Sequence, residues 1–195
     1  GKGMHESIPR LKESLRQVRR LDEIEKFKPL GGLLDAIQET ISAFTGRSDI
    51  MDTVVAAKWC AAHGLVQQGY TLIEENIYTA VCQAKGYDDQ DRSRRELVAS
   101  CLNVMLQKVN QKRWKLQGEI PNERQLAEMQ SVISFLEPYR EKLGRFLQLS
   151  TWRNNINHAE MAQNDKLSHE RLSRELKNII TELEPFFHEM DELSR

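Results

Sequence analysis

The sequence lacks an excess of either charge. Its 195 residues hold 28 Lys and Arg against 29 Asp and Glu, a formal net charge of -1. This balance excludes a histone-like basic protein and an acidic disordered tail, although a local cationic patch can still bind phosphate. No apolar run approaches 18 residues and the first thirty residues contain no signal-peptide core, so we expect neither a membrane span nor a secretion signal. The length and composition predict one globular domain, with or without an extension.

Cysteine is scarce and scattered. The three cysteines, Cys60, Cys82 and Cys101, form no CxxC pair, which favours a reducing cytoplasm over a disulfide framework. Cys60 and His63 are close enough to share a helix face, but a metal site needs further ligands. We therefore expect a cytoplasmic protein without a metal site or another cofactor.

Strand signals are absent as well. Apolar residues recur every three or four positions almost throughout, and no segment alternates as a strand does. This predicts an all-α fold with seven or eight helices. One long helical stretch is expected from about residue 50 to 84, where Gly64 and Gly69 indicate a bend or close helix packing. Pro121 fits the first position of a later helix, and Pro138 should kink that helix.

The first residues differ in character from the rest. They are charged and poor in glycine, and they end at a Pro-Leu-Gly-Gly break. We expect residues 1–29 to form a linker or dimer-strut helix and residues 30–195 to form a helical domain. Because the chain opens with Gly1 instead of Met, the sequence also favours an excised effector domain over a complete protein.

Most catalytic signatures are missing. The sequence has no P-loop, GxGxxG, HExxH or GxSxG motif, and no histidine has a Glu three positions earlier, as a di-iron bundle requires. The segment that remains is Trp-Arg-Asn-Asn-Ile-Asn-His-Ala-Glu at 152–160. Three asparagines there disfavour a helix. They indicate either a polar surface that holds a ligand, or an Asn-rich helix end with Arg153 and His158 on the surface.

The segment Arg-Asn-Asn-Ile-Asn-His-Ala-Glu resembles the R-x4-6-H signature of HEPN ribonucleases. Residues 61–71, followed by Glu74 and Glu75, also resemble a helix of the effector half of type III CRISPR-associated CARF–HEPN proteins. The resemblance covers residues of about 30 to 190. It implies a HEPN-like helical bundle with an N-terminal helical extension. It also implies a metal-independent endoribonuclease of antiviral defence that acts as a homodimer on single-stranded RNA and leaves 2',3'-cyclic phosphate ends.

One feature departs from that family. Its members carry an N-terminal CARF sensor of α/β fold for cyclic oligoadenylate, and this chain has no α/β segment to form one. We expect either that a CARF domain was removed upstream or that the chain is a stand-alone HEPN protein.

The resemblance assigns the chemistry to three residues. His158 would transfer protons, Arg153 would bind phosphate and stabilise the transition state, and Asn154 would orient the pair or bind the sugar-phosphate. A five-residue offset rotates by about 140° and rises roughly 7.5 Å on an ideal helix, so Arg153 and His158 do not share a face. Their convergence needs a distorted helix, a long reach by Arg153, or a second copy of the motif. The resemblance implies the last of these, a homodimer with a composite site.

A second cationic segment surrounds Lys112 and Arg113, next to Trp114. This pattern is typical of single-strand binders, so it predicts an RNA-guiding patch, or else a solvated helix end with Trp114 in the core. Two other functions remain open. One is a non-catalytic all-helical dimerisation or scaffold protein, and the other is a HEPN toxin or nucleotidyltransferase partner.

Overall fold

The computed structural model describes residues 4–22, 31–149, 151 and 169–195. Within these ranges the chain forms α-helices, short 3-10 helices and turns. There is no strand, and the one β-bridge in this part pairs Leu116 with Glu119. The all-α prediction is therefore confirmed, while the HEPN-like arrangement stays a prediction.

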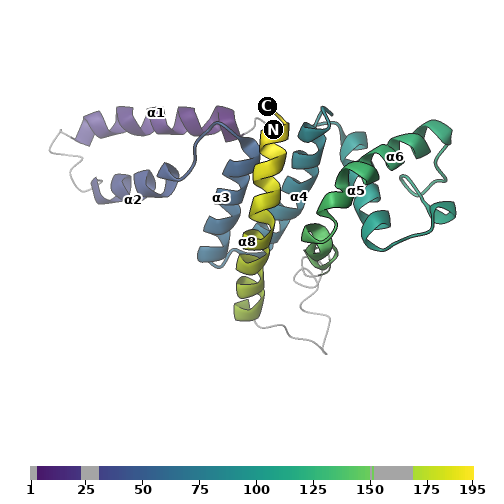
Figure 1. The fold of residues 1–195 in the computed structure, drawn as a ribbon. Coiled ribbons are helices and arrows are strands. Elements are labelled where there is room, and N and C mark those ends of the chain that lie inside the picture. The colour runs from purple at the N-terminus through teal and green to yellow at the C-terminus, as the bar shows by residue number, and fades with distance from the viewer. Residues whose placement is uncertain (1–3, 23–30, 150, 152–168) are drawn as a thin grey trace. The chain divides into compact units, whose positions relative to one another are not determined.

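The α-helices are seen in Figure 1. They are α1 (Met4–Asp22), α2 (Gly31–Ser42), α3 (Asp49–Ala62), α4 (Val66–Ala84), α5 (Arg92–Leu106), α6 (Glu123–Leu136) and α8 (His169–Leu193). The 3-10 helices are η2 (Gln111–Arg113), η3 (Glu137–Tyr139) and η4 (Lys142–Arg145).

The chain divides into two compact units, Gly1–Val55 and Ala56–Arg195. In the first unit α1 packs on α2 through Leu15, Leu34 and Ile41. These two helices lie on either side of the boundary expected at residues 29 and 30. The separate role expected for residues 1–29, as a linker or dimer strut, stays a prediction.

A buried carboxylate organises the chain after α2. Both oxygens of Asp52 accept backbone N–H groups, from Thr45 and Gly46, each at 2.7 Å. Gly46 has a positive φ of 68°, and a Cβ there would lie 2.9 Å from the Pro9 ring. Glycine is therefore required at this turn for both its backbone conformation and its small size.

The second unit is built around α4 and α8, which pack along each other (Figure 1). The α5 helix packs on α4, and α6 packs on α5. The core is closed by large apolar side chains at full burial, including Tyr70, Phe146, Phe186 and Phe187. At Gly69 the two central helices approach so closely that a Cβ would overlap Leu176. The predicted close packing at Gly69 is confirmed.

Three predicted helix boundaries need correction. The stretch from 50 to 84 is two helices, because Gly64 adopts a φ of 72° and ends the first at Ala62. Pro121 lies outside α6, whose cap is Asn122 in a capping box with Gln125. Pro138 does not kink a continuous helix, since α6 ends at Leu136 and the proline sits in the following 3-10 helix. A proline has no N–H to donate, so it is better placed where a new turn begins.

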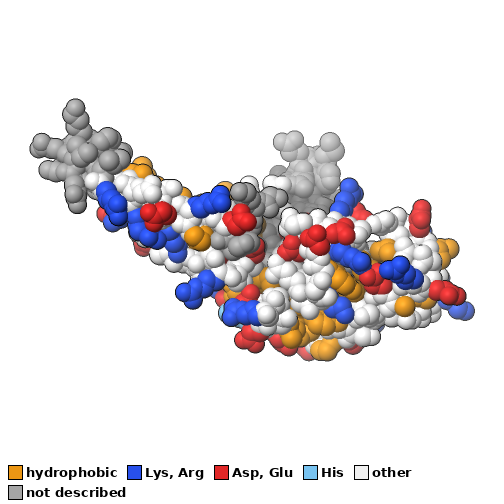
Figure 2. Space-filling model, turned by 90° about the horizontal axis from the view of Figure 1, so that it is seen from above, with side chains coloured by type: hydrophobic (Ala, Val, Ile, Leu, Met, Phe, Trp, Pro, Cys, Tyr) orange, Lys and Arg blue, Asp and Glu red, His pale blue; other side chains and the backbone are white. Residues whose placement is uncertain are grey.

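Charges of both signs are interspersed on the surface shown in Figure 2, with no continuous basic face. Across the described ranges, every helix is too short or too polar to cross a bilayer.

Candidate functional site

The three predicted catalytic residues, Arg153, Asn154 and His158, lie outside the described residues. The structure instead describes the chain on both sides of them, through Thr151 and again from His169. Both flanks belong to the second unit. Their contacts show how the described residues before and after the predicted segment are held.

The leading flank is fixed to α8 by Arg145, in η4. Its Nε lies 3.1 Å from Glu182 Oε2, and its Nη1 lies 4.0 Å from Glu175 Oε2. Phe146 and Leu149 follow and are buried. The chain therefore enters the predicted segment from a turn held on α8 by both charge and apolar packing.

The trailing flank is the first part of α8, which is hydrogen-bonded to the α3–α4 region. The Ser173 hydroxyl donates to the Ala61 carbonyl at 3.3 Å, and the Tyr70 hydroxyl donates to the Leu172 carbonyl at 3.0 Å. Burial, and secondarily the charge of Glu175, raises the pKa of Tyr70 above its usual value. Tyr70 therefore remains a proton donor at all physiological pH values, and the start of α8 stays joined to α4.

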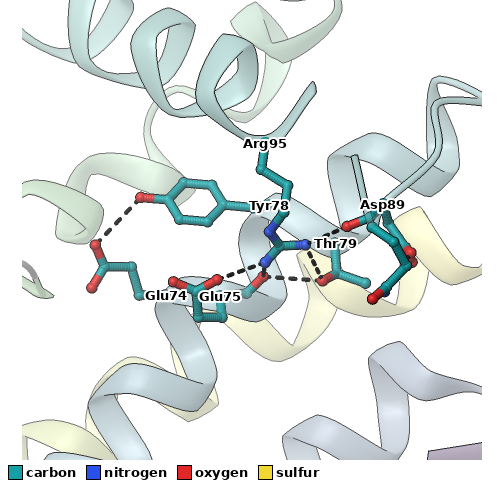
Figure 3. A network of polar contacts seen from close by, with 7 residues as sticks. Glu74, Glu75, Tyr78, Thr79, Asp89 and Arg95 are labelled. Carbon is teal, nitrogen blue, oxygen red and sulfur yellow. Dashed lines mark hydrogen bonds and ion pairs between the residues drawn. The ribbon is translucent and has the colours of Figure 1, made fainter. Parts of the chain in front are cut away.

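Arg95 joins α4 to α5, as Figure 3 shows. Its Nη1 donates to Thr79 Oγ1 and to the Asp89 carbonyl, each at 3.0 Å. Its Nη2 donates to the carbonyl and the carboxylate of Glu75, at 3.0 and 2.7 Å. The guanidinium is thus occupied by protein acceptors. This network serves to position the two helices and is a poor candidate for binding an RNA phosphate.

The neighbouring Glu74 has a different environment from Glu75. Its side chain is buried, and the Tyr78 hydroxyl donates to its Oε1 at 3.3 Å (Figure 3). Tyr78 also lies under the Arg95 guanidinium, 5.7 Å from ring centroid to Cζ. Both glutamates contributed to the resemblance. Glu74 points into the helix packing, and Glu75 points toward Arg95 of α5.

The predicted RNA-guiding residues Lys112 and Arg113 are both exposed, in η2. The half-buried Trp114 beside them donates from Nε1 to the Val109 carbonyl at 2.9 Å. This bond fixes the indole on its own loop and leaves the two cations at the surface. Their position suits contact with a phosphate backbone, and their role stays a prediction.

A second cationic surface was missed in the sequence. Arg174 and Lys177 are exposed on the N-terminal half of α8, as is Arg171 one turn earlier. The signal was present as three cations spaced by three residues, Arg171, Arg174 and Lys177, further along the chain than the predicted segment. It was hidden because α8 also carries Glu170, Glu175 and Glu182, and two of these pair with Arg145.

Metal ligation has no support among the described residues, where no group of three His, Cys, Asp or Glu side chains is placed to hold an ion. Cys60 is buried, whereas His63 is exposed and its Nδ1 lies 2.8 Å from the Trp59 carbonyl. The two residues therefore do not form one half of a site. All three cysteines are free and buried.

Comparisons with protein-family models, with curated proteins and with solved structures find no match to this chain.

Proposed function

We propose that the chain is a metal-independent endoribonuclease of HEPN type, which cleaves single-stranded RNA as a homodimer in cytoplasmic, CRISPR-associated antiviral defence. The observation that carries the proposal is the Arg153–His158 motif in an all-helical chain. Its support from the structure is local: both flanks of the motif are held in one compact unit, by Arg145 before it and by Ser173 after it.

The chemistry requires only the types of group that the motif supplies. A base removes the proton of the RNA 2'-OH, whose oxygen forms a bond to phosphorus while the bond from phosphorus to O5' breaks. An acid returns a proton to O5', so that the products are a 2',3'-cyclic phosphate and a 5'-hydroxyl. His158 is suited to proton transfer near neutral pH, and Arg153 can bind the phosphorane oxygens with a permanent charge. Asn154 would orient this pair.

A single His158 cannot be base and acid at the same moment. In a two-fold homodimer the same patch meets itself, which supplies two histidines and two arginines to one cleft. One His158 would then accept the proton from the 2'-OH, while the other donates to O5'. If a CARF sensor precedes the chain, it would regulate this activity, whereas a stand-alone HEPN protein would act without one.

The described cations fit the substrate. Arg95 and Arg145 are engaged by carboxylates. The exposed pairs Lys112 with Arg113, and Arg174 with Lys177, are candidates for backbone contact. RNA binding by such small patches is compatible with the near-zero net charge, since affinity depends on local phosphate contacts.

The test compares purified variants on a labelled single-stranded RNA in EDTA. Arg153→Ala and His158→Ala should each abolish cleavage, with helix content and molecular mass unchanged. His188→Ala and Arg124→Ala are matched controls, because both side chains are exposed on helices of the same unit, and they should cleave normally. Full activity of His158→Ala, or strict dependence on added Mg²⁺, would overturn the proposal. A scaffold protein would show no cleavage in any variant.

A further inference from the structure

Two aromatic rings are stacked on the surface at the end of α3. The Trp59 and His63 rings lie 4.2 Å apart between centroids, with an angle of 25° between their planes. Trp59 retains 38% exposure, and His63 is exposed as well. Tryptophan is large and apolar, so it is usually mostly buried. A solvent-accessible indole with a second ring already stacked on it is therefore unusual.

The hydrogen bond of His63 fixes the orientation of its ring. With its Nδ1 only 2.8 Å from the Trp59 carbonyl, Nδ1 must carry the proton, because a carbonyl oxygen is only an acceptor. The bond therefore leaves Nε2 as the nitrogen that is not engaged with Trp59. In the neutral ring Nε2 is an acceptor, suited to an N–H or O–H group of a ligand.

We propose that the Trp59–His63 pair is a stacking site for one base of the single-stranded RNA. The identity of this ligand rests on the proposed ribonuclease function. Single-strand binders stack bases on exposed aromatic rings because every base has a π face, whatever the sequence. Here the two rings are already stacked, so an incoming base extends an existing stack, and little ordering is needed on binding.

The surroundings of the ring pair suit a nucleotide better than an apolar partner. Exposed amides follow at Gln67 and Gln68. The N-cap residue of α4, Leu65, makes no side-chain cap hydrogen bond, and the positive end of a helix favours a phosphate next to the base. The Ser173–Ala61 bond places the start of α8 beside the end of α3, and the exposed Arg174 is the next residue along that helix.

Leu65 provides a matched control for the ring pair. It has the same exposure as Trp59, 38%, and lies two residues after His63. If this surface bound an apolar protein segment, truncating Leu65 would weaken binding as truncating Trp59 does. If a base stacks on the rings, only the aromatic residue is required.

The experiment measures the affinity of a fluorescently labelled oligoadenylate single strand by anisotropy, in the His158→Ala background so that the strand stays intact. Trp59→Ala and Trp59→Leu should each weaken binding by roughly 5- to 100-fold, the usual effect of losing one stacked base. Trp59→Phe should lose less than about threefold, and Leu65→Ala should bind unchanged. Sedimentation of each variant reports its oligomeric state.

The outcomes separate this inference from the ribonuclease proposal. Unchanged affinity of Trp59→Ala would overturn the stacking site, and so would equal losses in Trp59→Leu and Leu65→Ala. If Trp59→Ala lowers the molecular mass of the assembly in sedimentation, Trp59 lies in a contact between subunits, and the stacking site is overturned. Cleavage of the same strand by the unsubstituted chain is measured in parallel, and its absence would count against the ribonuclease proposal itself. If the RNA strand does not bind even to the protein that retains Trp59, both the stacking site and the ribonuclease proposal are overturned.

Discussion

Gly69 of α4 lies directly against Leu176 of α8, where the two central helices of the second unit pack closely together. A Cβ at position 69 would overlap Leu176 Cδ2, and Leu176 itself is fully buried. The helical contact that supports the flanks of the predicted catalytic segment thus depends on the absence of one methyl group.

Gly69→Ala is therefore expected to destabilise the protein. An alanine in a helix interior normally gains about 1 kcal/mol over glycine, but here the overlap with Leu176 should outweigh this and lower the free energy of unfolding by about 1–3 kcal/mol. Urea denaturation followed by circular dichroism measures the change. Gly32→Ala in α2 is the control, because a Cβ there meets nothing within 4 Å. A stabilised Gly69→Ala protein would contradict the close helix contact.

Arg95 and Arg92 on α5 provide a matched pair for the network in Figure 3. Arg95→Met removes the donors to Glu75, Thr79 and the Asp89 carbonyl while keeping an apolar stem. We expect the free energy of unfolding to fall by about 2 kcal/mol, since the part-buried acceptors at Thr79 and Asp89 and the Glu75 carboxylate lose a charged partner.

The control for that change is Arg92→Met. The Arg92 side chain is 89% exposed and pairs with Glu96 four residues on, so its loss should cost less than about 0.5 kcal/mol. Equal effects of the two substitutions in the same denaturation assay would show that the Arg95 network does not hold α4 and α5 together.

Stability should fall in alkaline solution because of two buried thiols. Burial raises the pKa of Cys82 to about 11 and that of Cys101 to about 12, from an ordinary value of 9.0. Above about pH 9 the thiols of the unfolded chain lose their protons while those of the folded chain keep them. The unfolded state is therefore stabilised relative to the folded state. Each thiol then lowers the free energy of unfolding by up to about 1.4 kcal/mol per pH unit.

Chemical denaturation at several pH values between 8 and 10.5 measures this slope. Cys101→Ala should make the slope of the free energy of unfolding against pH shallower, by about the contribution of one thiol. The tyrosines provide a background common to both proteins, since burial also raises the pKa of Tyr139 to about 12. An unchanged slope in Cys101→Ala would show that its thiol is accessible in the folded chain.

The cations of η2 are expected to contact RNA phosphates. Replacing both Lys112 and Arg113 by glutamine should weaken single-strand binding and reduce the slope of log affinity against log salt by about 1.4, which corresponds to two lost contacts. The measurement is a salt titration of anisotropy with an uncleaved strand. Arg92→Gln is the control and should leave the slope unchanged. A double variant with an unaltered slope would assign the two cations to a solvated surface.

The helices were predictable because their apolar residues repeat along the chain, and that signal is local. The separation of α3 from α4 could not be predicted in this way, because a glycine within a helical pattern is compatible with a bend, a close contact or a turn. Gly64 makes the turn, as its positive φ shows, and Gly69 makes the contact with Leu176 of α8.

The candidate site was predictable only in part. The spacing of Trp59 and His63 allows contact on one helix face, but their exposure depends on which other helices cover α3. The role of Arg145 likewise depends on α8, whose Glu182 lies 37 residues further along the chain. The motif of Arg153 and His158 is apparent in the sequence alone, and its function rests on chemistry that an assay must establish.

The most direct test of the ribonuclease proposal is the nature of the ends left on a single-stranded RNA after incubation with the purified chain in EDTA. We predict 2',3'-cyclic phosphate and 5'-hydroxyl ends, formed by the unsubstituted protein and absent with His158→Ala. Intact RNA after incubation with the folded, unsubstituted protein would contradict the proposal, as would 5'-phosphate ends or ends that still form with His158→Ala.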